Sequence, residues 1–173
     1  DRLIELMNFQ ATNEEDRAIN DKRIERLKNK YHSYYPDQTE GIEIIFEIKN
    51  LLELQKTIAQ HREGKDPEKR LSKEERMKIF ESLTEYQFLM THYIIGISGK
   101  PGSRFFLSKF WQLGEEIAKS FGMLGEFIGI RKGVLGQVAS YKILEELGFS
   151  PRLPHPKLDA FYSLDLLTEE NVA

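Results

Sequence analysis

Residues 133–149 read GVLGQVASYKILEELGF, and along this stretch the chain changes from one kind of secondary structure to another. Apolar residues occupy most of the helical circumference, which is typical of a helix that packs against a sheet. Gly148 is a natural C-cap, because glycine adopts the left-handed conformation that ends many helices. We therefore expect a helix over 133–147 and a new element that starts at Phe149.

The segment that follows this helix is expected to contain a strand. Residues 159–167, DAFYSLDLL, suit an extended chain, and TEEN at 168–171 has the composition of a hairpin turn. The two-residue period of a strand places Asp159 and Asp165 on one face. Asp165 interrupts an apolar run, where a carboxylate must be paired, bind a metal or reach solvent. The alternative is an edge strand in which Asp165 faces water.

Residues 133–167 resemble the opening of the PD-(D/E)xK nuclease core. That core runs helix, strand and Asp-bearing strand, followed by a strand that carries Glu or Gln, any residue, and Lys. By this resemblance Asp165 takes the place of the catalytic, metal-binding Asp, and Asp159 that of an accessory acid. Gln137 stands where many members have a helix Glu, and its neutral amide is a weaker ligand for a divalent cation. The last of these strands would begin at Val172, so this chain would hold half of the site.

The resemblance implies a restriction-endonuclease-like α/β core that hydrolyses phosphodiester bonds in nucleic acid. Mg²⁺ or Mn²⁺ would activate water and neutralise charge in the transition state. The sequence begins without a Met or a signal-like pattern and ends within an apolar run, so we expect a longer parent protein. The 173-residue chain alone is expected to be inactive as a nuclease.

Helices are expected in the first two thirds of the chain. Capping boxes stand at Thr12–Glu15 and Ser72–Glu75, where a hydroxyl and a carboxylate satisfy each other's backbone amides. A helix should follow each box, and Pro36 should end the first one. A further long helix is indicated over 44–58 by apolar residues at helical spacing, before a linker loop at 64–67.

At least three long helices should thus precede Gly96, and strand should appear only after Phe149. Residues 42–48 are the segment most open to a strand interpretation instead. The fold class predicted from these patterns is mainly α, with a multi-helix N-terminal region followed by the start of the α/β core.

Nine glycines fall between Gly96 and Gly136. Each glycine inside a helix costs about 1 kcal/mol relative to alanine, so this density indicates broken helices or close helix packing. SGKPGS at 98–103 lacks the Lys-Ser or Lys-Thr pair of a phosphate-binding loop and is expected to be a turn. We divide the chain into a helical domain (1–95), a Gly/aromatic-rich helical connector (96–132) and an incomplete nuclease-like core (133–173).

Charge is unevenly distributed, with net values of −3 over residues 1–95, +4 over 96–157 and −4 over 158–173. The middle segment is the one candidate surface for a polyanion. Aromatic residues are interleaved with its cations, and these rings could stack on bases or simply form the core. The candidate nucleic-acid contacts are the cations Arg104, Lys109, Arg131 and Lys132.

Several classes of function are excluded by composition. The chain has no cysteine, so disulfides and thiolate chemistry are absent, and a cytoplasmic setting is expected. Its four histidines lack zinc-site spacing, and no G-x-S-x-G motif is present. The longest uncharged apolar run, 86–99, is too short to span a membrane. Nucleic acid and a homodimer are the candidate partners, and the alternative function is a non-catalytic helical interaction or oligomerisation module.

Overall fold

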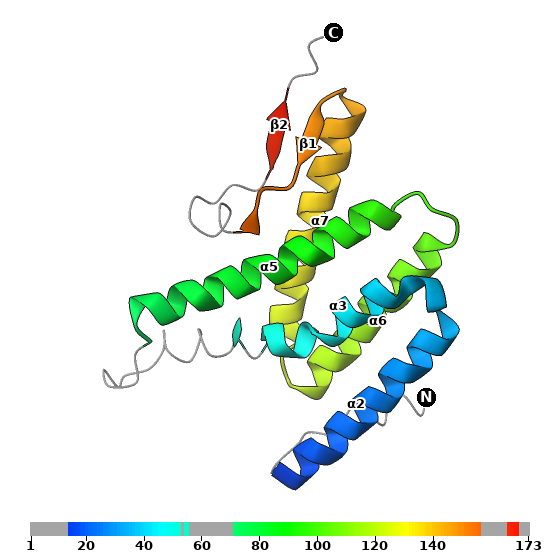
Figure 1. The fold of residues 1–173 in the computed structure, drawn as a ribbon, viewed down its shortest axis with the longest axis vertical. Coiled ribbons are helices and arrows are strands. Elements are labelled where there is room, and N and C mark those ends of the chain that lie inside the picture. Colours follow the sequence, from blue (N-terminus) through cyan, green and yellow to red (C-terminus); the bar gives the residue numbers. More distant parts are fainter. Residues whose placement is uncertain (1–13, 53, 56–70, 157–165, 170–173) are drawn as a thin grey trace. The chain divides into compact units, whose positions relative to one another are not determined.

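The computed structural model describes residues 14–52, 54–55, 71–156 and 166–169, and it is mainly helical (Figure 1). In chain order the elements are α2 (Glu14–Tyr34), the 3₁₀ turn η1 (Pro36–Gln38), α3 (Thr39–Phe46), α5 (Lys73–Ile97), α6 (Ser103–Ser120), α7 (Leu124–Glu146), β1 (Ser150–Arg152) and β2 (Leu167–Glu169). The predicted predominance of helix is confirmed. Within the described residues strand occurs only after Phe149, as expected.

The chain divides into two compact units, one comprising residues 1–52 and 99–128 and the other residues 53–98 and 129–173. Helix α7 begins in the first unit and continues into the second. The division into segments 1–95, 96–132 and 133–173 stays a prediction.

In the first unit, α3 packs against both α2 and α6. Helix α2 ends at Tyr34, and Pro36 opens η1, which confirms the stop signal read from the sequence. The proposed capping box at Thr12 lies outside the described residues. Aromatic rings join the helices, since Tyr31 contacts Phe46 and Tyr35 contacts Phe106 edge-on. The core of this unit is closed by fully buried side chains from three segments, namely Ile42, Ile45, Ile48, Leu51, Leu52, Phe110, Ile117 and Phe127.

Residues 42–48 are helical up to Phe46, so the strand interpretation is excluded. Ile42, Ile45 and Ile48 are all buried, and their three-residue spacing is that of one face of a helix. The single helix predicted over 44–58 is corrected in two respects. It begins earlier, at Thr39, and it is interrupted at Glu47 before helical conformation resumes over 48–52 and 54–55. The predicted linker at 64–67 lies outside the described residues.

The glycine-rich region contains two unbroken helices rather than fragments, and one of its glycines is required by close packing. A Cβ atom on Gly114 of α6 would lie 2.5 Å from the Phe127 ring and 2.8 Å from Ile45 Cδ1. Both distances are shorter than non-bonded carbon–carbon contacts in proteins. Helix α6 can therefore lie this close to Phe127 and Ile45 only because Gly114 has no side chain. The segment 98–102 forms the predicted turn, in which Gly99 and Gly102 have positive φ.

In the second unit, α5 begins at the predicted capping box. The Glu75 amide donates to Ser72 Oγ at 3.1 Å, and the Ser72 amide donates to Glu75 Oε2 at 2.7 Å. On this helix Leu83, Met90 and Ile94 are buried, whereas Phe80 is 38% exposed. Figure 1 shows α5 crossing α7, whose residues Ile130 and Val134 are buried.

The helix predicted over 133–147 begins earlier, at Leu124, and ends at Glu146. Gly148 is the predicted C-cap, with a φ of +87°. The Phe149 amide donates to Leu144 O and the Gly148 amide donates to Glu145 O, which together form a Schellman motif. The chain then enters β1, which pairs antiparallel with β2 in the register Ser150 opposite Glu169 and Arg152 opposite Leu167. The hairpin turn expected at 168–171 is wrong for Thr168 and Glu169, because pairing with β1 holds both residues in β2.

The close approach at Gly114 gives a test of the fold. Gly114→Ala should lower the free energy of unfolding by about 1–3 kcal/mol, since the added methyl group overfills the contact with Phe127. Gly133→Ala is the matched control, because a Cβ there meets nothing within 4 Å and the change should stabilise the helix by up to about 1 kcal/mol. Urea unfolding followed by circular dichroism measures both. Equal effects of the two substitutions would contradict the packing described.

Candidate functional site

The two predicted acids, Asp159 and Asp165, lie outside the described residues. Their roles as catalytic and metal-binding groups therefore stay predictions. The described part of the chain resumes at Leu166, and β2 begins at Leu167, two residues after Asp165 in the sequence.

The third predicted site residue, Gln137, lies on α7 and is half-buried. Its Oε1 accepts a hydrogen bond of 2.9 Å from the hydroxyl of Thr91 on α5. Thr91 has no exposed surface, so its hydroxyl needs a partner inside the protein. The Gln137 amide thus joins α5 to α7 within the second unit. Sequence reasoning missed Thr91, although a hydroxyl on the apolar face of α5, one residue after Met90, is the signal that could have indicated it.

The described residues do not by themselves fit a divalent cation. No group of three or more His, Asp or Glu side chains that could hold a metal occurs among them. Gln137 contributes one amide oxygen, and that oxygen already accepts the Thr91 hydroxyl. A magnesium site needs several oxygen ligands. The described part of the chain therefore supplies no metal site.

The four predicted cationic residues lie on two helices in different units. Arg104 and Lys109 belong to α6, and Arg131 and Lys132 are neighbours on α7. Arg104 and Lys132 are exposed, whereas Lys109 is half-buried and donates to Gln112 Oε1 at 3.3 Å. Among the interleaved aromatic residues, the core interpretation is confirmed for Phe106, Phe110, Trp111 and Phe127, which are buried.

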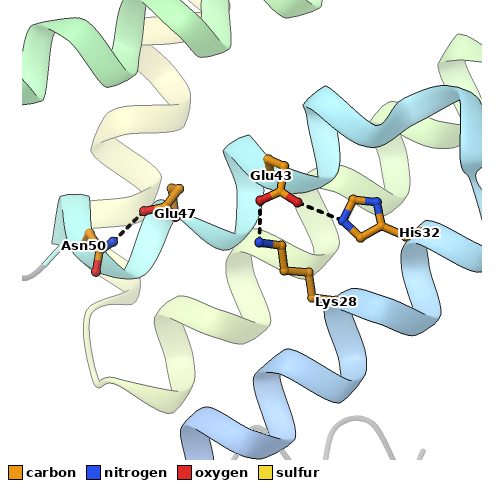
Figure 2. Close-up of polar contacts among 5 residues, drawn as sticks. All are labelled: Lys28, His32, Glu43, Glu47 and Asn50. Atoms are coloured by element: carbon orange, nitrogen blue, oxygen red, sulfur yellow. Dashed lines mark hydrogen bonds and ion pairs between the residues drawn. The ribbon is translucent and has the colours of Figure 1, made fainter.

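A charged cluster that the sequence analysis did not predict links α2 to α3 (Figure 2). Glu43 Oε1 lies 2.9 Å from His32 Nε2, and Glu43 Oε2 forms an ion pair with Lys28 Nζ. A second ion pair, Lys49 with Asp21 at 2.9 Å, joins α2 to the segment after α3. Lys28 and His32 lie four residues apart and hence on one face of α2, which is the signal the sequence offered. Figure 2 also shows the bond from Asn50 to Glu47 within the following turn.

The cluster fixes the ionisation of Glu43. Its hydrogen bond with Lys28 is the main cause that lowers the pKa of Glu43 below the ordinary value of 4.5, with His32 adding to the effect and burial opposing it. A lysine, a histidine and one ionised glutamate without a nucleophile match no catalytic triad. We interpret the cluster as a clamp that orients α2 on α3.

Comparison with protein families, with curated proteins and with solved structures finds no match to this chain. No helix among the described residues is long and apolar enough to cross a membrane.

The bond between the two helices of the second unit can be tested directly. Thr91→Val should lower the free energy of unfolding by about 1–2 kcal/mol, because the new methyl group cannot donate to Gln137. Adding Gln137→Leu should then cost little more, since the shared bond is lost only once. Thr84→Val is the control, because that hydroxyl bonds to Phe80 O within α5 itself. Independent, additive costs at Thr91 and Gln137 would show that the bond does not carry the effect.

The clamp gives a pH-dependent prediction. A lowered carboxyl pKa means that the stabilising contribution is fully present above pH 4.5 and is lost as the pH falls through the folded-state value. Glu43→Gln should therefore cost up to about 1 kcal/mol at pH 7, an amount limited by solvent screening of the 45% exposed carboxylate, and almost nothing at pH 2.5.

Urea unfolding of the wild type and the variant at both pH values measures the difference. Glu40→Gln, an exposed position on the same helix, is the control and should be neutral within about 0.5 kcal/mol. A cost at Glu43 that is independent of pH would be inconsistent with the ionised clamp.

Proposed function

We propose that this chain carries the opening of a nuclease-like core and binds nucleic acid. One observation supports the proposal above the others, namely the succession of a long helix, a glycine-terminated turn and two antiparallel strands over α7, β1 and β2. This is the order in which the PD-(D/E)xK core begins, and β2 begins two residues after Asp165 in the sequence. Fold order alone does not assign chemistry, so the proposal must be tested at the residues.

The second unit carries the basic groups that such a function needs. Arg131 and Lys132 are adjacent on α7, and Arg152 is exposed on β1, within the same unit. Cations of this kind bind phosphates through charge and counterion release, with little dependence on base sequence. Hydrolysis would depend on Asp165 and Asp159, with Mg²⁺ or Mn²⁺ supplying an activated water. We expect this chain alone to bind nucleic acid without cutting it.

Fluorescence anisotropy with a labelled 20-base-pair duplex and the corresponding single strand tests the binding. The double variant Arg131→Gln, Arg152→Gln should weaken binding and reduce the slope of log affinity against log salt by about two. Lys22→Gln, which removes an exposed cation from α2, is the matched control and should bind as the wild type does. Absence of binding at about 50 mM salt, or equal binding by the double variant, would overturn the proposal.

Asp165 provides a second arm of this experiment. Under the proposal, Asp165 and Asp159 are like charges that share a face, so Asp165→Asn should leave the metal-free chain equally stable or more stable. A structural Asp165 that accepts buried hydrogen bonds would behave oppositely, and its loss would cost about 1–3 kcal/mol. Thermal melts with a chelator distinguish the two cases, with the exposed Asp37→Asn as the control. A clear loss of stability would remove the support for Asp165 as a site residue.

A second candidate function, an oligomerisation module, is favoured by a specific observation on α7. Leu135 and Ile143 are 39% and 56% exposed, although both lie in the interior of this long helix. Large apolar side chains that face water on one helix are typical of surfaces that bind another protein. Gel filtration with light scattering over a range of protein concentrations tests this candidate, and a mass of about 20 kDa at every concentration would exclude self-association.

A further inference from the structure

One side of α7 in the second unit combines apolar and charged residues in a regular order. Five residues on this side follow each other at intervals of three, four, four and three positions, and they therefore lie on one face of the helix. All five are exposed, and we call them the α7 face: Lys132, Leu135, Ala139, Ile143 and Glu146. The face has a cation at its start, an anion at its end, two apolar side chains between them and a methyl group at its centre.

The spacing of these residues is symmetric about Ala139, and the two ends carry opposite charges. If a second copy of α7 lies antiparallel across the face with the two-fold axis at Ala139, Leu135 meets Ile143 of the second copy. In the same arrangement Lys132 meets Glu146 of the second copy, and the mirror contacts form on the other side of the axis. A two-fold interface requires this kind of self-complementary surface. Parallel alignment would instead place each Lys132 beside another Lys132.

The remaining geometry is compatible with such pairing. Ala139 at the centre presents only a methyl group, which allows the helix axes to approach within about 8 Å. Lys132 and Glu146 are separated by about 21 Å along one helix, so they cannot pair within a copy. Lys142 forms an ion pair with Glu145, and neither residue belongs to the face. Within the described part of the chain no ion pair involves Lys132 or Glu146.

We propose that the α7 face is a self-association surface and that its occupant is a second copy of this chain, packed antiparallel about Ala139. This inference rests on the oligomerisation candidate and assigns its partner and orientation. The charge order argues for a second copy, because the pattern is complementary to itself only in the antiparallel alignment.

Charge reversal tests the orientation. Lys132→Glu and Glu146→Lys should each raise the dimer dissociation constant by about tenfold, since each change replaces two attractive pairs with two repulsive ones. The double variant, Lys132→Glu with Glu146→Lys, should restore association to within about threefold of the wild type. Sedimentation velocity on the whole 173-residue chain at about 50 mM salt measures all four proteins. Lys142→Glu, which changes a charge outside the face, is the control and should leave the constant unchanged.

A cysteine placed on the axis gives an independent measurement. Since the chain has no cysteine of its own, Ala139→Cys offers one thiol per copy, and the proposed axis brings two such thiols within reach of each other. Copper-phenanthroline should convert this variant to a covalent dimer within minutes. Glu145→Cys, at an exposed position on another side of α7, should remain mostly monomeric on a reducing-agent-free gel.

The outcomes separate this inference from the candidate function on which it rests. A dimer that is insensitive to the single charge reversals and is not crosslinked through Ala139→Cys would overturn the α7 pairing while self-association stood. Loss of association in the single variants without recovery in the double variant would overturn the antiparallel orientation. A monomer at every concentration would overturn both. Restoration by the double variant together with crosslinking at Ala139 supports the proposal.

Discussion

The hydrogen bond from Thr91 to Gln137 marks the side of α7 that faces α5, and the direction of the α7 face is argued from it. Thr91 is fully buried on α5, and its hydroxyl donates to Gln137 on the neighbouring helix. Because successive residues of an α-helix are about 100° apart, Ala139 lies roughly 160° around α7 from Gln137. The side that bonds to α5 and the α7 face therefore point in nearly opposite directions.

This constraint also changes how Gln137 is understood. In the nuclease resemblance Gln137 replaces a metal-binding glutamate, and an amide in that position loses the charge that a cation requires. In the structure the same amide provides a neutral acceptor for a buried hydroxyl, a partner that needs no charge. Both interpretations use Oε1, but only the structural one explains why an uncharged side chain suffices. If the nuclease proposal holds, its metal chemistry rests on Asp159 and Asp165 and not on α7.

Local chemistry made parts of the fold predictable from the sequence. The Ser72 capping box and the glycine at Gly148 satisfy backbone groups within a few residues, so neither depends on tertiary structure. Prediction failed where distant segments decide the outcome. Thr168 and Glu169 have turn-like composition, but β1 supplies their partners. The interruption at Glu47 was missed for another reason, because no proline or glycine marks it in the sequence.

The candidate site was predictable to a smaller extent for the same reason. The basic residues were found because composition displays them, but the Thr91–Gln137 bond joins positions 46 residues apart and cannot be seen without the packing of α5 on α7. The clamp between Glu43 and α2 likewise needed the turn at Pro36 to bring two helices together. Exposure of Leu135 and Ile143 contradicts what their hydrophobicity alone suggests, which is why the α7 face emerged only from the structure.

Thiol accessibility along α7 tests the central claim, the rotation of this helix, most directly. Single cysteines introduced in turn at Ile130, Val134, Leu135, Ala139 and Ile143 would be reacted with a maleimide at a protein concentration low enough to keep the chain monomeric. The account predicts rates near that of a free thiol at 135, 139 and 143, rates at least tenfold lower at 130 and 134, and protection of the first three sites as the protein concentration rises. Fast reaction at 130 and 134 with slow reaction at 139 in the dilute protein would contradict it.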